Sequence, residues 1–140
     1  MPILTLSHFP AIRAALDTEL TAEVLPDDTI NLPIYREAAD QDVLDLDPDA
    51  ETRTGTEQAR VQRAAIYFCA ARLAPVVSRI NQMNLGNGGM SYSREVFDPD
   101  ERADQLREMA RKEIDAILTP DEAAPRRPIA FAKAIGRRGR

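Results

Sequence analysis

The sequence predicts an all-α fold: a small helical bundle of about four helices with one long central helix. Apolar residues recur three or four positions apart in four separate segments, which is the spacing of one face of a helix. Prolines, acidic turns and a glycine cluster separate these segments. A chain of 140 residues is long enough for one domain with its own hydrophobic core. We expect that domain to span residues 1–120.

Two helices are expected before residue 47. The first is predicted over residues 9–20, with Ser7 as its cap. Its apolar stripe consists of Phe9, Ile12, Leu16 and Leu20. The second follows the turn at residues 24–28 and ends near Leu46, with its regular part beginning near Pro33. Its apolar stripe consists of Tyr35, Ala39, Val43 and Leu46.

The longest apolar segment predicts the central helix, from a cap at Thr56 to about Met83. Between Ala64 and Leu73 only Arg72 is strongly polar, and a helix that is apolar on nearly all sides is one surrounded by neighbours. Pro75 lies inside this segment and removes one backbone hydrogen bond. We therefore expect a kink there, with a break into two helices as the alternative.

A flexible glycine-rich loop at residues 86–92 and a fourth helix complete the predicted domain, with weak evidence for a short strand near residues 91–97. Asp98 is the expected cap of this helix and Pro99 its first residue. Glu101 stands three residues after the cap, as in a capping box. The inward face consists of Ala103, Leu106, Ala110, Ile114 and Ile117.

Residues 121–140 form a C-terminal tail of different composition. Pro125 and Pro128 exclude a continuous helix, and the tail has too few apolar residues for a core, so we expect it to be disordered when free. It carries six basic and two acidic residues, a charge of +4. Because the net charge of the whole chain is −5, the rest of the chain carries −9. A basic tail favours an acidic partner or a polyanion, whereas an acidic body repels nucleic acid.

No set of residues indicates catalysis, a cofactor or a metal site, so we do not expect an enzyme. Cys69 lies in an apolar run and is predicted to be buried; His8 is predicted to be a surface or capping residue. The glycine cluster lacks the Gly-Lys-Ser/Thr of a phosphate-binding loop. Without a secretory signal or an apolar run of membrane-spanning length, we expect a soluble protein made in the cytoplasm.

The alternation of Asp45, Asp47 and Asp49 is similar to the start of a calcium-binding loop. The match fails because the sixth position is Ala50 instead of glycine and the twelfth is Thr56 instead of a bidentate glutamate. We therefore expect a solvated acidic turn.

Several short motifs occur in a fixed order along residues 8–118. They are Leu25-Pro26-Asp27-Asp28, then Tyr35-x-x-Ala38-Ala39 with Val43-Leu44, then Arg63-Ala64-Ala65-Ile66-Tyr67, and then Ser91-Tyr92-Ser93 before the last helix. This order of elements resembles the head–tail connector adaptors of long-tailed phages, a family also present in gene transfer agents and prophages. The motifs carry no catalytic signature.

The resemblance implies a structural protein of the virion neck, made in the bacterial host cytoplasm. It implies a homo-oligomeric ring, usually a dodecamer, between the portal protein and the stopper or tail-completion protein, with DNA passing through it without specific binding. It also implies that the C-terminal segment docks on the portal, although Pro125 and Pro128 leave the docked conformation open. The candidate portal-binding residues are Arg126, Arg127, Ile129, Phe131, Ile135, Arg137 and Arg138.

Two other functions are compatible with the sequence. The basic tail, with Phe131 as a stacking residue, could bind nucleic acid and make the chain a nucleic-acid-binding accessory protein. A small enzyme or ligand-binding helical protein is the other alternative, although no convergent set of ligand or catalytic residues supports it.

Overall fold

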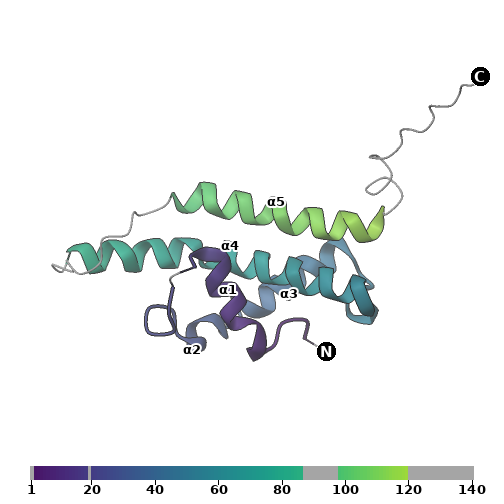
Figure 1. Ribbon diagram of the computed structural model, residues 1–140, viewed down its shortest axis with the longest axis horizontal. Helices are drawn as coiled ribbons and strands as arrows, with labels where there is room; N and C mark the ends of the chain where they lie inside the picture. Colours follow the sequence, from purple (N-terminus) through teal and green to yellow (C-terminus); the bar gives the residue numbers. More distant parts are fainter. Residues whose placement is uncertain (1, 19, 87–97, 120–140) are drawn as a thin grey trace, which may run out of the picture.

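The computed structural model describes residues 2–18, 20–86 and 98–119, and every regular element in this part of the chain is helical. This confirms the predicted all-α fold (Figure 1). The elements are η1 (Leu6–His8), α1 (Phe9–Leu16), α2 (Asp27–Ile30), α3 (Arg36–Leu46), η2 (Ala50–Thr52), α4 (Gly55–Gly86) and α5 (Pro99–Leu118). None of the described helices is long and apolar enough to span a membrane. Of the loop predicted at 86–92, Gly86 is instead the last residue of α4; the rest of that loop, the short strand considered near 91–97 and the tail at 121–140 lie outside the described residues.

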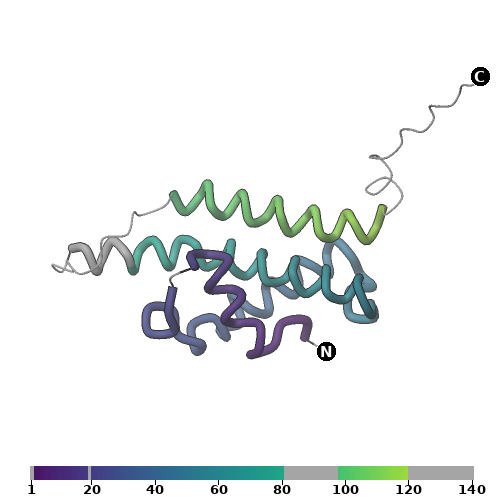
Figure 2. Tube along the Cα trace, in the orientation of Figure 1, coloured from purple at the N-terminus to yellow at the C-terminus, as the bar shows by residue number. Residues whose placement is uncertain are grey.

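The long helix α4 is the centre of the molecule and packs against α1, α3 and α5. Helix α5 runs antiparallel along one side of α4, while α1, α2 and α3 lie on the other side (Figures 1 and 2). The ion pairs agree with the antiparallel arrangement of α4 and α5, since Arg60 and Arg63 near the start of α4 both pair with Glu113 near the end of α5. Because α5 is supported mainly by α4, one flank of α5 is left open beside α3.

The middle of α4 is enclosed as the sequence predicted. Every residue from Ala64 to Leu73 is buried except Tyr67, which is half-buried, and Arg72. The alternative of two helices broken at Pro75 is wrong, because α4 continues as one helix through this residue. Pro75 itself is exposed, and Leu73, Ala74 and Val77 around it are buried. Packing on both sides therefore holds the helix together where one backbone hydrogen bond is missing.

The final helix matches the prediction at both its start and its inward face. The carboxylate of Asp98 accepts hydrogen bonds from the backbone N–H groups of Asp100 and Glu101, at 3.0 and 3.3 Å. Pro99 follows as the first helical residue. All five residues of the predicted stripe are buried: Ala103, Leu106, Ala110, Ile114 and Ile117.

The boundaries near the N-terminus differ from the prediction. Helix α1 ends at Leu16 because Asp17 is extended, and Leu20 packs against the core from a loop instead of a helix. Ser7 is not the cap of α1, because it lies within η1, which runs directly into α1. His8 immediately precedes α1 but makes no side-chain hydrogen bond that caps it; its ring instead caps η1, since its Nδ1 accepts the backbone N–H of Thr5 at 3.0 Å.

The predicted second helix is two helices, α2 and α3, separated by the turn at residues 31–35. Pro33 has no N–H to donate, so regular helix resumes only at Arg36. Ala39 and Val43 are buried as expected, but Leu46 at the end of α3 is 40 % exposed and is not a core residue. Likewise Thr56 is not a cap, because α4 begins one residue earlier at Gly55, whose positive φ of 62° suits glycine.

Two charged side chains fix the N-terminal part to the rest of the domain. Arg13 of α1 is buried and pairs with Asp27 at the start of α2. Asp40 of α3 accepts the backbone N–H groups of Ile3 and Leu4, each at 3.1 Å. Burial raises the pKa of the Asp40 carboxyl above its usual value, although these two hydrogen bonds oppose the shift.

Candidate functional site

The predicted portal-binding residues all belong to the tail and lie outside the described residues. They are Arg126, Arg127, Ile129, Phe131, Ile135, Arg137 and Arg138. The candidate site within the described part of the chain is therefore a different feature, on the helical body.

This feature is a groove of about 310 Å³ on the open flank of α5, and three helices line it. The residues follow helical spacing: two residues four apart on α4, two four apart on α5, and a group on the last turns of α3. The lining residues are Asp42, Asp45, Leu46, Phe68, Arg72, Arg107 and Arg111. We call this the α3–α5 groove.

The groove has apolar residues between charged ones. Phe68 of α4 is only 5 % exposed, so the groove reaches the edge of the hydrophobic core. Leu46, at the end of α3, presents its side chain to solvent although it is large and apolar. An apolar side chain entering the groove would cover mainly Leu46, which is favourable because it removes apolar surface from water.

The Arg72–Asp42 ion pair holds the α3 side of the groove in place. The guanidinium donates from both Nε and Nη2 to the two carboxylate oxygens of Asp42, each at 2.9 Å. These hydrogen bonds raise the pKa of Arg72 above its usual value. A bidentate pair of this kind fixes the angle between the two side chains as well as their distance, so α3 and α4 are joined at the groove.

The positive charges on the α5 side of the groove are less fully paired with acidic side chains than Arg72 is. Arg107 pairs with Asp104 of its own helix at 3.0 Å, and this contact is exposed to solvent. Arg111 is exposed and makes no ion pair with any side chain in the described part of the chain. Since Asp42 is already engaged by Arg72, the α5 rim can attract an acidic group.

Charge is unevenly distributed over the helices. Residues 36–52, which include α3 and η2, contain seven acidic residues and one basic residue. In α4 the balance is reversed, with four arginines and one glutamate. Three of these arginines bind acidic residues of the helices on either side of α4: Arg60 and Arg63 on α5, and Arg72 on α3. Helix α4 therefore neutralises part of the charge of its neighbours and helps to hold them.

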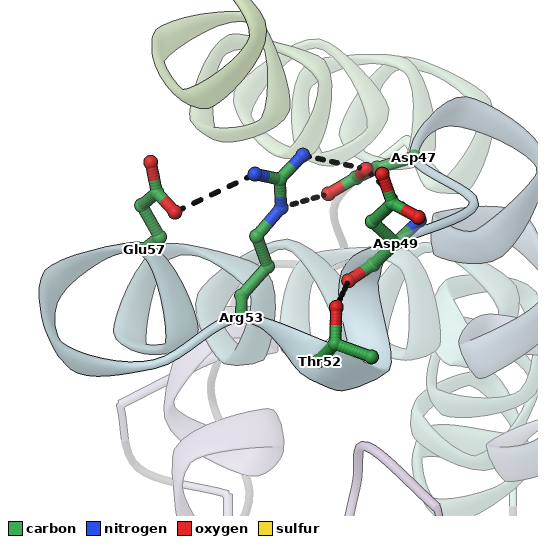
Figure 3. Close-up of polar contacts among 5 residues, drawn as sticks. All are labelled: Asp47, Asp49, Thr52, Arg53 and Glu57. Carbon is green, nitrogen blue, oxygen red and sulfur yellow. Dashed lines mark hydrogen bonds and ion pairs between the residues drawn. The ribbon is translucent and has the colours of Figure 1, made fainter.

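The turn between α3 and α4 is a second polar cluster, centred on Asp47 and Arg53 (Figure 3). The side chain of Asp47 is 1 % exposed, and Arg53 donates to both of its oxygens at 3.0 Å. Glu57 lies 3.5 Å from the other terminal nitrogen of Arg53. The hydrogen bond from Arg53 holds the pKa of Asp47 below its usual value.

The expected solvated acidic turn is therefore wrong for Asp47, which is buried and paired. Its Oδ1 also accepts the backbone N–H of Asp49 at 3.2 Å, and the Thr52 hydroxyl donates to the Asp49 carbonyl at 2.8 Å (Figure 3). A guanidinium thus occupies the position that a cation would need. In the described part of the chain, no group of three His, Cys, Asp or Glu side chains is placed to hold a metal ion. The cluster fixes the corner between two helices.

Cys69 is buried, as predicted, and is not placed to act as a nucleophile. Burial raises the pKa of its thiol to about 12, so the thiolate is not populated at neutral pH.

The sequence interpretation missed the α3–α5 groove. Its only local signals were Arg72, the single strongly polar residue in an apolar run, and the pair Arg107 and Arg111 four residues apart. No family model matches the chain, and comparisons with curated proteins and with solved structures found no match.

Proposed function

We propose that this chain is a head–tail adaptor subunit of a tailed phage or phage-like particle, located at the virion neck. The observation that carries the proposal is the order of elements. A short helix, the Leu-Pro-Asp-Asp segment that enters α2, the short helix α3, a long alanine-rich helix and a last helix follow one another in the order of elements that resembles the adaptor family. The copies would form a ring, in the family usually a dodecamer, between the portal and the stopper or tail-completion protein.

The charge of the body supports a role around a DNA channel. The described side chains include 19 acidic and 11 basic residues, a formal charge of −8, concentrated on α3 and η2. A ring that places this face toward the channel would repel the phosphate backbone, and the duplex could slide through without being held.

The tail is the proposed portal anchor. Its arginines would pair with acidic groups of the portal and its apolar residues would fill portal grooves; a segment that folds on its partner can cover a large surface. The residues proposed for this contact are Arg126, Arg127, Ile129, Phe131, Ile135, Arg137 and Arg138.

A complementation experiment tests the proposal. Cells that assemble the particle without this chain should accumulate DNA-filled heads that lack tails. Adding the purified full-length protein to those heads, with purified tails, should restore joined particles. Normal particle yield in the absence of the chain would contradict the proposal.

The charge of +4 in residues 121–140 favours one other function, a nucleic-acid-binding accessory protein. Binding of duplex DNA to the full chain, measured at about 50 mM and at about 200 mM salt, separates the two functions. If the tail makes about six phosphate contacts, raising the salt concentration over that range should weaken DNA binding by about a thousandfold. The adaptor proposal predicts no measurable binding at the higher concentration, because the acidic body opposes it.

A further inference from the structure

The turn between α2 and α3 presents two large apolar side chains to solvent. Leu32 is 47 % exposed and Ile34 is 63 % exposed, on either side of Pro33. Adjacent exposed apolar side chains of this size are characteristic of contact surfaces when they form a patch. We call residues 31–35 the apolar turn.

The apolar turn is held rigidly by the helices around it. Arg36 donates to the side-chain oxygen of Asn31 at 2.5 Å and to the backbone carbonyl of Leu4 at 3.2 Å. Tyr35 is half-buried and packs against the core. A turn whose ends are already held in place loses less entropy when it docks.

The charges beside the apolar turn complement those beside the α3–α5 groove. Exposed Asp28 precedes the turn and exposed Glu37 follows it. The rim of the groove provides Arg107 and Arg111, the latter without an ion-pair partner among the described residues. The turn thus combines apolar side chains with flanking acids. The groove combines an apolar lining with a basic rim on α5, opposite an α3 side that carries the Arg72-paired Asp42 and the exposed Asp45.

One molecule cannot fill its own groove with its own turn. The turn precedes α3, whereas the groove lies along the last turns of that 11-residue helix, at Asp42, Asp45 and Leu46. At 1.5 Å per residue, the 8 positions from Ile34 to Asp42 and the 12 to Leu46 place the two about 12 to 18 Å apart. Any contact between them must therefore join two copies.

We propose that the apolar turn of one copy inserts into the α3–α5 groove of the next. The contact is head-to-tail, since two different surfaces meet, and such contacts close into rings when the rotation between copies permits. This inference rests on the proposed function for its ring, and it names the surfaces that join neighbouring subunits. The contact is weak between two free subunits and is strengthened by repetition around the ring.

Disulfide crosslinking of purified variants tests the contact. One variant carries Ile34→Cys, the second carries Leu46→Cys, and both keep the buried Cys69. When the two are mixed under mild oxidation, the account predicts a mixed dimer of twice 15.5 kDa. The control replaces Leu46→Cys with Leu118→Cys, since Leu118 is 46 % exposed but does not line the groove. The groove pair should crosslink about tenfold faster than the control pair, because docking raises the effective concentration of the two thiols.

A rate no greater than that of the control would overturn the proposal. Equally fast dimerisation of Ile34→Cys with itself would also overturn it, because that result indicates a symmetric contact between two turns. Adding Arg111→Glu to the groove variant should slow the mixed reaction, whereas Lys112→Glu, an exposed change on the same helix but outside the groove, should not. Equal effects of the two changes would contradict the predicted rim contact.

These outcomes are separable from those of the proposed function. A ring at the particle neck together with failed crosslinking would leave the adaptor role intact and refute this contact. Efficient crosslinking by a chain that is absent from particles would support the contact and refute the adaptor role.

Discussion

Replacing Phe9 and Phe68, which are both buried among the described residues, should show which of them faces the groove. Phe9 is fully enclosed, whereas Phe68 is 5 % exposed and lines the α3–α5 groove. Loss of either ring removes a transfer free energy of about 2–3 kcal/mol. In Phe9→Ala the enclosed cavity adds to this loss, for a total of about 4–5 kcal/mol. In Phe68→Ala the vacated space joins the groove and fills with water, so the total should be near the lower limit, about 3 kcal/mol.

Urea unfolding followed by helical circular dichroism measures both values, provided that the slope of the transition is unchanged. For a body of this size, 3 kcal/mol corresponds to a fall in melting temperature of about 12 °C. A loss below about 1 kcal/mol for Phe68→Ala would show that the ring is not part of the core. A loss equal to that of Phe9→Ala would show that the groove does not reach Phe68.

Four further changes test separate parts of the structure. Asp47→Asn should lower the melting temperature most at neutral pH. Because the pKa of Asp47 is lowered in the folded protein, its charge stabilises the fold fully at pH values above the unfolded pKa of about 3.9. This stabilisation should be lost as the pH falls through the folded pKa. A difference in melting temperature that does not depend on pH would refute the pairing with Arg53. Asp98→Ala should cost about 1 kcal/mol through the lost cap of α5, and an unchanged urea midpoint would contradict it. Pro75→Ala should stabilise the body by about 1–3 kcal/mol because alanine restores the backbone hydrogen bond that the exposed proline lacks within α4, and a destabilised variant would show that the proline shapes the packing. Deleting residues 121–140 should leave the melting of the body unchanged and abolish joining of heads to tails; joining at normal yield would exclude the tail as the portal anchor.

Local patterns predicted the parts of the fold that depend on local chemistry. The stripe of α5 and its cap at Asp98 both follow from residues within a few positions of one another. The enclosure of α4 follows from its composition alone. Whether α4 continues through Pro75 was less predictable, because packing against residues distant in the sequence keeps the helix continuous there.

The groove and the Asp47 pair could not be read from local patterns. Phe68 and Arg111 are 43 positions apart, and whether α5 lies close enough to α3 to leave a groove depends on tertiary packing. The side chains of Asp47 and Arg53 are six positions apart across η2, a separation at which neither a regular helix nor an extended strand would bring them into contact. The spacing of Leu46 fits the stripe of α3 and predicts a core residue, but the helix ends there and the side chain stays 40 % exposed.

The most direct test of the account is a cryo-electron microscopy reconstruction of the neck of purified particles. The account predicts a closed ring of this chain between the portal and the stopper, with the acidic α3 face toward the DNA channel and the tail against the portal. Finding the chain on the capsid surface or within the tail tube, or a neck that does not contain it, would contradict the account.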